Sequence, residues 1–519
     1  MKTTLQLSIL ILLFIPVLSN AQTFARTIGS SQSDNAQAVV WASDENFVTV
    51  GSTASFGGAS NIFLVKTDMN GDTIWSHIYD HGGNLDYGNS IIATSDGGMM
   101  VAGWTFTSTT TNYEDLLLMK LNIDGEIEWA KAYGGPEQER GFNVKQTADG
   151  GYIIVGYTAA FGAGLTDIYL VKVESDGDIE WTKTYGGNVG EEGYSVCQNT
   201  DLGYTIAGTA RSNVSTYEGV LIRTDEDGDV VWAKTYGGSD SAEAFNYAEQ
   251  TTDGGFIATG NTYSFAHDVY VVKTDADGDE DWSKLYGGTV GDDTGFAIRE
   301  LSIGGYIMTG YYVRPETGAD GYLVRMDEVG DTLWTRGFGG VSDDQIKWVE
   351  ILGSQGFMLA GHTVSSGYGN GDMYNIRTDA DGHSSCSEFS LPTNVSVAPT
   401  IVAEWTPTVS YGGTQSDVVM SVAHGGYLQA CAGVGVDDID DGSSVTQIYP
   451  NPTSGIITLQ NEDDILALRM MDMSGRVVSI HDKIRNPIFS MNVDDLDPGQ
   501  YVLQVSSGKK IETLMIVIE

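Results

Sequence analysis

The stretch DGDIEWTKTYGG, residues 176–187, decides the fold because close variants of it recur along the chain. Further copies begin at Asp124, Asp227, Asp277 and Val329. The tryptophans of the repeat follow one another at intervals of 54, 52, 51, 50 and 52 residues: Trp75, Trp129, Trp181, Trp232, Trp282 and Trp334. A period this regular, in units of turn residues and short apolar runs, predicts a repeated β unit.

Each unit has four strand-like runs, named a to d in chain order. In the third unit they read FNVKQTA, YIIVGYT, DIYLVKV and IEWTKTY. A DGG-type turn joins a to b and a DGD-type turn joins c to d, and in both the glycine supplies the positive φ that a tight hairpin needs. Four-stranded units that repeat about every 52 residues are typical of a β-propeller. We therefore predict an all-β protein with a seven-bladed β-propeller at residues 22–385.

The seventh unit has no recognisable strand d of its own. After its strand c the chain reads HSSCSEFS, with Cys386 at the tryptophan position. Ahead of the first unit, the run FARTIG at residues 24–29 aligns with WAKTYG at residues 232–237. We expect residues 24–28 to form the outer strand of the seventh blade and to close the ring, which removes exposed edges.

The composition is strongly acidic, with 26 Lys and Arg against 70 Asp and Glu and a net charge of −44 over 519 residues. Such a field repels nucleic acid and anionic membrane surfaces. Residues 1–21 have the pattern of a secretory signal peptide: Lys2, an apolar run from Leu5 to Leu18, and small residues before Gln22. No later segment is long and apolar enough to predict a transmembrane helix. We expect a protein exported through the periplasm.

Residues 386–446 are rich in Thr, Val, Ser and Pro, and we interpret them as a β-rich connector. The run SVAHGGYLQACAG within them also resembles strands a and b of a decayed repeat. Cys386 and Cys431 bracket this segment, so they either close it as a disulfide or stay reduced. Cys197 lies in a predicted strand as an unpaired thiol.

The last segment, residues 447–519, has its own pattern of four strand-like motifs: IYPNPTSGIITL, MDMSGRVV, LDPGQYVLQV and KKIETLMIV. Their alternation of apolar and polar positions predicts a small antiparallel β-sandwich. These motifs resemble the type A C-terminal sorting domain of the type IX secretion system of Bacteroidetes, and the repeats resemble secreted propeller proteins that carry it. The resemblance implies the secretion machinery as a partner and an outer-surface or extracellular location. The residues that carry the sorting motifs are Tyr449, Pro450, Asn451, Pro452, Gly455, Gly475, Arg476, Gly499 and Tyr501.

Three sets of charged residues recur at fixed positions. A carboxylate opens strand a in every unit: Asp34, Asp86, Glu139, Glu191, Glu243, Asp293 and Asp344. A cation ends every strand c, and a basic residue recurs in strand d, so that 13 of the 26 Lys and Arg occupy two repeat positions. We interpret the carboxylates as structural, paired with a cation or with backbone amides. The alternative is an electronegative channel mouth that binds a cation.

The b–c loops are the variable part of the repeat and carry aromatic residues: Phe56, Phe106, Tyr113, Phe161, Tyr217, Phe265, Tyr312 and Tyr368. Because strands alternate in direction, these loops share a face with the d–a connections. Aromatic side chains on such loops suit the stacking of a sugar or contact with a protein. They also occur as ordinary loop packing.

The sequence gives little support for an enzyme. The seven histidines show no zinc-ligand spacing, no G-x-S-x-G motif occurs, and the glycines join strands instead of opening helices. We predict no metal and no cofactor. The first hypothesis is a non-catalytic binding or adhesion module at the cell surface, with a glycan or a protein as its ligand. The alternative is a polysaccharide hydrolase or lyase that uses the propeller channel, since a carboxylate pair is compatible with this composition.

Overall fold

The computed structural model describes residues 23–55, 60–107, 113–213, 216–238, 242–262, 268–287, 291–314, 318–367, 370–384, 388–391, 394–398, 401–404, 408–418, 420–424, 427–430, 447–449, 456–472, 477–493, 496, 499–507 and 510–518. The chain divides into two compact units, Met1–Val434 and Gly435–Glu519. Apart from one short 3-10 helix, η1 (Gly353–Gln355), every regular element in these residues is a β-strand. The predicted all-β class is confirmed.

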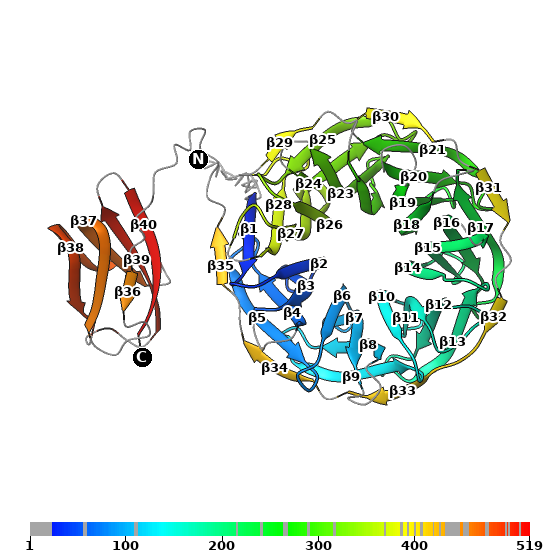
Figure 1. Cartoon of the computed structure of the whole chain (residues 1–519), viewed down its shortest axis with the longest axis horizontal. Helices are drawn as coiled ribbons and strands as arrows, with labels where there is room; N and C mark the ends of the chain where they lie inside the picture. Colours follow the sequence, from blue (N-terminus) through cyan, green and yellow to red (C-terminus); the bar gives the residue numbers. More distant parts are fainter. Residues whose placement is uncertain are drawn as a thin grey trace, which may run out of the picture. The chain divides into compact units, whose positions relative to one another are not determined.

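The first unit consists of seven five-stranded antiparallel sheets around a common centre (Figure 1). We number the sheets 1 to 7 in chain order. Their innermost strands, which correspond to strand a, are β2 (Asp34–Trp41), β6 (Asp86–Ala93), β10 (Glu139–Gln146), β14 (Glu192–Gln198), β18 (Glu243–Gln250), β22 (Thr294–Glu300) and β26 (Asp344–Ile351). Each innermost strand contacts the next, and β26 contacts β2.

Strands b and c follow outward in each sheet. Strand b is β3 (Phe47–Thr53), β7 (Met99–Phe106), β11 (Tyr152–Thr158), β15 (Tyr204–Asn213), β19 (Phe256–Thr262), β23 (Tyr306–Arg314) and β27 (Phe357–Thr363). Strand c is β4 (Asn61–Thr67), β8 (Glu114–Leu121), β12 (Asp167–Val173), β16 (Thr216–Thr224), β20 (Val269–Thr274), β24 (Gly318–Met326) and β28 (Asp372–Thr378). Both strands are almost wholly buried, because neighbouring sheets pack on both of their faces.

Strand d in sheets 1 to 6 is β5 (Thr73–Asp80), β9 (Ile127–Gly134), β13 (Ile179–Gly186), β17 (Val230–Gly237), β21 (Glu280–Gly287) and β25 (Thr332–Phe338). In sheet 7 this place is taken by β1 (Phe24–Gly29), which pairs antiparallel with β28 in the register Phe24 to Arg377. The predicted pairing of residues 24–28 with the last repeat is therefore confirmed.

A fifth strand lies outside strand d in every sheet and comes from residues 388–430, which we call the belt. The belt visits sheets 6, 5, 4, 3, 2, 1 and 7 in turn, through β29 (Glu388–Ser390), β30 (Asn394–Val397), β31 (Ile401–Glu404), β32 (Thr408–Ser410), β33 (Thr414–Asp417), β34 (Ser421–His424) and β35 (Tyr427–Ala430). In Figure 1 it forms the yellow to orange rim of the ring. The idea of a decayed repeat is wrong, because β34 and β35 pair with different sheets and not with each other.

The recurring DGD and WxKxYGG phrases form a clasp between successive sheets. In sheet 3, the Tyr185 hydroxyl donates to Gly228 O at 2.7 Å in the c–d turn of sheet 4. Trp181 covers the same glycine, Gly228, whose φ is +77°. The equivalent glycines of the other c–d turns have φ values between +78° and +84°. Lys183 Nζ lies 2.6 Å from Asp229 Oδ1 in that turn. The tryptophan, the lysine and the tyrosine thus each contact a different group of the next c–d turn. This explains why all three recur with the same period.

The second unit is a separate antiparallel sheet with its own apolar core. Its strands are β36 (Gln447–Tyr449), β37 (Ile456–Asp472), β38 (Val477–Asn492), β39 (Gly499–Ser507) and β40 (Lys510–Ile518). The longest strand, β37, pairs with β36, β38 and β39. The core includes Leu459, Leu468, Leu503 and Ile516.

Candidate functional site

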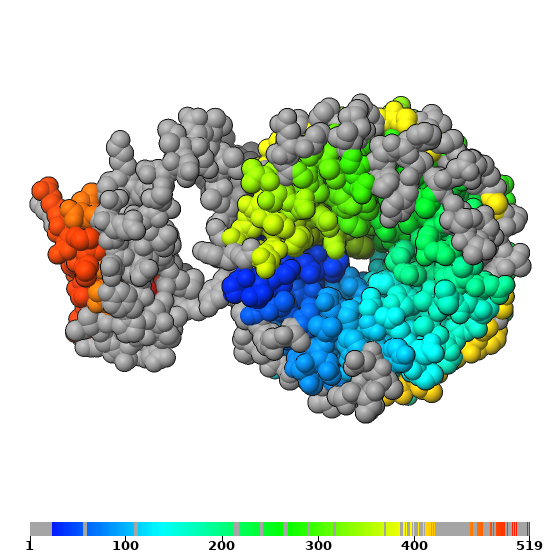
Figure 2. Space-filling model, viewed as in Figure 1, coloured from blue at the N-terminus to red at the C-terminus, as the bar shows by residue number. Residues whose placement is uncertain are grey.

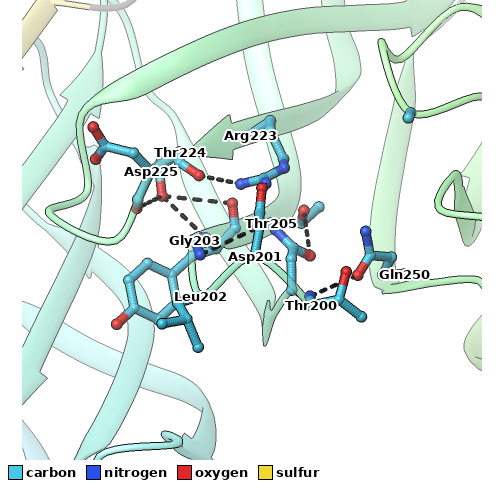
Figure 3. A network of polar contacts seen from close by, with 12 residues as sticks. Thr200, Asp201, Leu202, Gly203, Thr205, Arg223, Thr224, Asp225 and Gln250 are labelled. Atoms are coloured by element: carbon cyan, nitrogen blue, oxygen red, sulfur yellow. Dashed lines mark hydrogen bonds and ion pairs between the residues drawn. The ribbon is translucent and has the colours of Figure 1, made fainter.

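The cations that end strand c bind the a–b turn of their own sheet and not the strand-a carboxylates. Figure 3 shows this in sheet 4, where Arg223 forms an ion pair with Asp201 and donates to Thr224 O. In sheet 3, Lys172 Nζ lies 2.8 Å from Asp149 Oδ2. Burial alone would raise the pKa of Asp149, but the bonds from Lys172 and Thr147 outweigh it and bring the pKa to about 2. These cations therefore fasten turns.

The strand-a carboxylates bond to amides and hydroxyl groups within their own repeat. All seven are at most 3% exposed: Asp34, Asp86, Glu139, Glu191, Glu243, Asp293 and Asp344. Glu139 accepts from the amide of Gly135 at 2.8 Å and from Thr158 Oγ1 at 2.6 Å. Asp344 accepts from the amide of Gly340 at 2.9 Å. Such burial leaves them unable to form an exposed electronegative mouth.

A second carboxylate from strand c of the preceding sheet lies beside several of these groups. Asp115 in β8 hydrogen-bonds to Glu139, and the two flank Gly134. Burial raises the pKa of Glu139 to about 7, and the charge of Asp115 adds to the shift. Burial likewise raises the pKa of Asp115. The close pair is stable when it holds a proton.

The predicted loop aromatics that the structure describes do not form a cluster with one another. Phe56, Phe265 and Tyr368 lie outside the described residues. Phe161 packs against Tyr169 and the belt residue Gly412. Phe106 lies edge-on to Trp104 at 6.0 Å, and Tyr312 is half-buried against an apolar core cluster. Tyr113 and Tyr217 are the exposed members, at 44% and 39%.

Each innermost strand a carries a β-bulge, which provides a further recurring position at the inner edge of the sheets. In all seven sheets the a–b register shifts at the third residue after the strand-a carboxylate, and this residue is left out of the ladder. A bulge re-aims the side chain that it carries. We call the seven residues the bulge ring: Gln37, Asn89, Phe142, Tyr194, Asn246, Phe296 and Lys347.

Contacts between neighbouring sheets join members of the bulge ring. Lys347 Nζ donates to Gln37 Oε1 at 3.2 Å and lies 5.6 Å from the centroid of the Phe296 ring. The rings of Phe142 and Tyr194 are 5.3 Å apart. All seven residues are half-buried, so part of each side chain reaches solvent. An amide, an aromatic ring and an ammonium group thus lie side by side on the innermost strands of sheets 1, 6 and 7.

One end of strand a adds a polar and aromatic rim. Tyr87, two residues before Asn89, stacks on Trp104 at 4.2 Å between ring centroids. Arg140 lies over the same indole at 4.5 Å and forms an ion pair with Glu114. The Arg140 side chain is 32% exposed. The rim belongs to the face of the b–c and d–a connections, where the sequence places its variable loops.

Trp348 narrows the ring centre. It occupies the residue after Lys347, where sheets 1 and 6 have the small residues Ala38 and Ala297. The indole packs against core clusters from sheets 1 and 2, 7 and 1, 6 and 7, and 5 and 6. Its ring lies 5.4 Å from that of Tyr247. The space-filling view shows the side chains closing in on a narrow hollow (Figure 2).

The a–b turns carry a second depression, of about 490 Å³, lined by residues that include Lys145, Thr147 and Cys197. Burial lowers the pKa of Lys145 and repulsion by Arg299 adds to the shift. Burial raises the pKa of the free Cys197 thiol to about 11, so the thiol stays protonated and unreactive. Arg299 Nε is held by Glu249 Oε2 at 2.8 Å.

The described residues contain no group of three or more His, Cys, Asp or Glu side chains arranged to hold a metal ion. They also contain no helix of sufficient length and apolarity to cross a membrane. Cys386 and Cys431 lie outside the described part of the chain, so their proposed disulfide stays a prediction.

The sequence did not identify the bulge ring. The sequence feature that marks it is the position three residues after the repeated carboxylate. The residue type at this position changes from repeat to repeat, whereas the surrounding pattern is periodic. A bulge cannot be located from alternation alone, because it shifts the alternation by one residue.

Residues 447–519 match the family model described as a secretion system C-terminal sorting domain. Of the predicted sorting-motif residues, Tyr501 is buried in the core of the second unit and Gly499 begins β39. Tyr449 ends β36, whereas Pro450, Asn451, Pro452, Gly455, Gly475 and Arg476 lie outside the described residues. The sorting domain shows that the protein is exported to the cell surface or the extracellular space by the type IX machinery.

No curated protein matches the sequence. The solved structures that show weak likeness to the chain include three with 9% to 15% sequence identity. A puromycin hydrolase is 15% identical with a TM-score of 0.39, and the match covers 64% of this chain and 51% of the hydrolase. A protein of unknown function from Dyadobacter fermentans is 10% identical with a TM-score of 0.39, and the match covers 69% of this chain and 98% of that protein. The extracellular domain of a putative hybrid two-component system from B. thetaiotaomicron is 9% identical with a TM-score of 0.34, and the match covers 95% of this chain and 57% of that domain. These likenesses carry no argument about function.

Proposed function

We propose that the first unit is a closed seven-bladed β-propeller that works at the cell surface as a non-catalytic binding module, with a glycan as its ligand. Support for the closed ring comes from β1, which completes sheet 7, and from the contact of β26 with β2. The belt strengthens this view, because it pairs with every sheet in one circuit. A protein ligand is the other outcome of the test below.

The observation that carries the binding role is the bulge ring. Seven half-buried side chains lie at the bulges of the seven innermost strands, and they include three amides and three aromatic rings. Amides hydrogen-bond to sugar hydroxyls, and aromatic faces stack on the apolar faces of sugar rings. Pre-formed concave sites with a few convergent polar groups are the usual form of a ligand site.

The bulge ring also argues for binding without turnover. It contains no carboxylate, whereas glycoside hydrolysis uses a pair of them on either side of the scissile bond. The repeated carboxylates are buried and bonded to amides and hydroxyls. We therefore place the polysaccharide hydrolase or lyase second.

The test is a binding screen of the purified full chain against immobilised glycans, with product release measured on every glycan that binds. We expect binding without release of shorter sugars. Tyr194→Ala should weaken binding at least about tenfold by loss of a stacking face, whereas Tyr113→Ala, in an exposed b–c loop, should leave it unchanged. Turnover, or binding that depends on Tyr113 and not on Tyr194, would overturn the proposal.

A further inference from the structure

Among the described residues of the first unit, six cations lie outside the two repeat positions, and five of them interact with a carboxylate. Arg140, Arg299 and Arg314 form ion pairs with Glu114, Glu249 and Asp320. Arg211 lies 3.8 Å above the Tyr217 ring, and its charge opposes the burial that raises the pKa of the nearby Glu191. Lys145 faces Glu249 and Glu350, which oppose the lowering of its pKa. The sixth is Lys347.

Lys347 has no carboxylate partner among the described residues. Its ammonium group donates to the Gln37 amide oxygen and lies over the Phe296 ring, and both groups are neutral. The titratable neighbour is His362 of β27, whose pKa is lowered by burial and further by the Lys347 charge. Desolvation lowers the pKa of Lys347 itself to about 8. In a chain with 70 acidic residues, a half-buried lysine without an acidic partner is an exception.

We propose that the bulge ring selects anionic sugars, with the Lys347 ammonium as the group that binds a sugar carboxylate or sulfate. This inference rests on the glycan-binding function proposed above. An ammonium group in a partly desolvated space is unfavourable until an anion joins it. Gln37 and Phe296 flank it with an amide and an aromatic face, which suit the hydroxyl groups and the ring of the same sugar.

The net charge of −44 does not prevent this selection. At physiological ionic strength, charges on the outer surface are screened over roughly 8 Å, whereas groups that touch in a half-buried site are screened much less. The lysines at the repeat positions add little to the electrostatic potential at the ring centre, because turn aspartates already neutralise them. The Lys347 ammonium therefore makes the largest electrostatic contribution to the binding of a sugar that touches it.

The test measures dissociation constants of the full chain for galacturonic acid oligomers, their methyl esters, sulfated galactose oligomers and neutral galactose oligomers. We expect the anionic sugars to bind at least about tenfold tighter than the neutral ones. The carboxylated and sulfated arms identify which anion is preferred. At pH 8 the binding of an anion should also draw a proton onto Lys347, which calorimetry in buffers of different ionisation enthalpy detects.

Three variants locate the effect. Lys347→Met should remove the preference, because it weakens the binding of anionic sugars at least about tenfold more than that of neutral ones. It should fold, since it deletes a half-buried charge that has no carboxylate partner among the described residues. Lys347→Arg should keep the preference and hold it above pH 8, where the lysine loses its proton. Lys183→Met, on the outer strand d of sheet 3 where the ammonium group pairs with Asp229, is the control and should leave the preference unchanged.

The outcomes separate the two proposals. Anion preference that survives in Lys347→Met, or an equal affinity for neutral and anionic sugars, overturns the role of Lys347 while the glycan-binding function stands. Failure of every sugar to bind overturns both.

Discussion

Phe24 at the start of β1 packs against Gly71 in the c–d turn of sheet 1: a Cβ added to Gly71 would lie 2.8 Å from the Phe24 ring. Gly71 also has a φ of +81°. Phe24 stands where the other sheets have tryptophan, and Arg26, at the lysine position, donates to Asn70 O at 3.3 Å. The N-terminal strand thus repeats the aromatic and basic contacts of the clasp between sheets 7 and 1, but not the tyrosine hydroxyl bond, because Ile28 stands at that position.

This contact predicts that Gly71→Ala destabilises the chain more than Gly150→Ala. Both glycines have a positive φ, at +81° and +89°, so both substitutions cost about 1–2 kcal/mol of backbone strain. A Cβ at Gly150 meets nothing within 4 Å, whereas at Gly71 it meets the buried Phe24 ring. We expect a further loss of about 1–3 kcal/mol in the free energy of unfolding of Gly71→Ala, measured by urea denaturation. Equal losses would contradict the clasp.

The hydroxyl of Tyr185 predicts a second effect on stability. Tyr185→Phe removes the only donor that the tyrosine side chain offers to Gly228 O and leaves that carbonyl buried. We expect the free energy of unfolding to fall by about 1–2 kcal/mol. Tyr113→Phe, at a 44% exposed position, is the matched control and should have no measurable effect. A loss of similar size in both variants would show that the hydrogen bond is not the cause.

The clasp explains why so much of the fold was predictable. Trp181, Lys183 and Tyr185 each contact the next turn, so each must recur with the repeat, and their spacing reveals the number and order of the strands. Phe24 and Arg26 keep enough of this pattern for the pairing of β1 to be predicted.

The belt and the bulge ring could not be predicted in the same way. Belt strands have three or four residues each and no shared motif, and they pair through backbone groups that any sequence supplies. Lys347 and Phe296 occupy equivalent positions but have different side chains, so periodicity does not mark them. The aromatic loop residues were conspicuous in sequence, yet Phe161 serves to pack the belt.

The pair of Glu139 and Asp115 predicts a stability that depends on pH. Burial raises the pKa of Glu139 from 4.5 to about 7, so the folded state binds more protons than the unfolded state between these values. The free energy of unfolding should therefore fall as the pH rises from 4.5 to about 7, by no more than about 3 kcal/mol from this group. Glu139→Gln, which mimics the protonated acid, should flatten this part of the profile. A variant with the same slope as the wild type would contradict the assignment.

The belt residue Gly412 predicts a local effect. Its carbonyl accepts from Thr182 Oγ1 at 2.5 Å and from Tyr169 Oη at 3.1 Å, and a Cβ there would clash with the Phe161 ring. Gly412→Val should raise hydrogen exchange in β32 and β33 and leave β11 and β12 protected. Tyr411→Ala changes the adjacent residue, which is 67% exposed, and should leave exchange in β32 and β33 as it is in the wild type. Faster exchange throughout sheet 3 would mean that the belt is part of one cooperative unit with it.

The most direct test of the binding function is a crystal structure of the full chain with a bound galacturonic acid oligomer. We predict that one carboxylate lies within hydrogen-bonding distance of Lys347 Nζ, with the sugar against Phe296 and Gln37 at the ring centre. A sugar bound only at the a–b turns beside Lys145, or only on the outer loops around Tyr113 and Tyr217, would contradict the account.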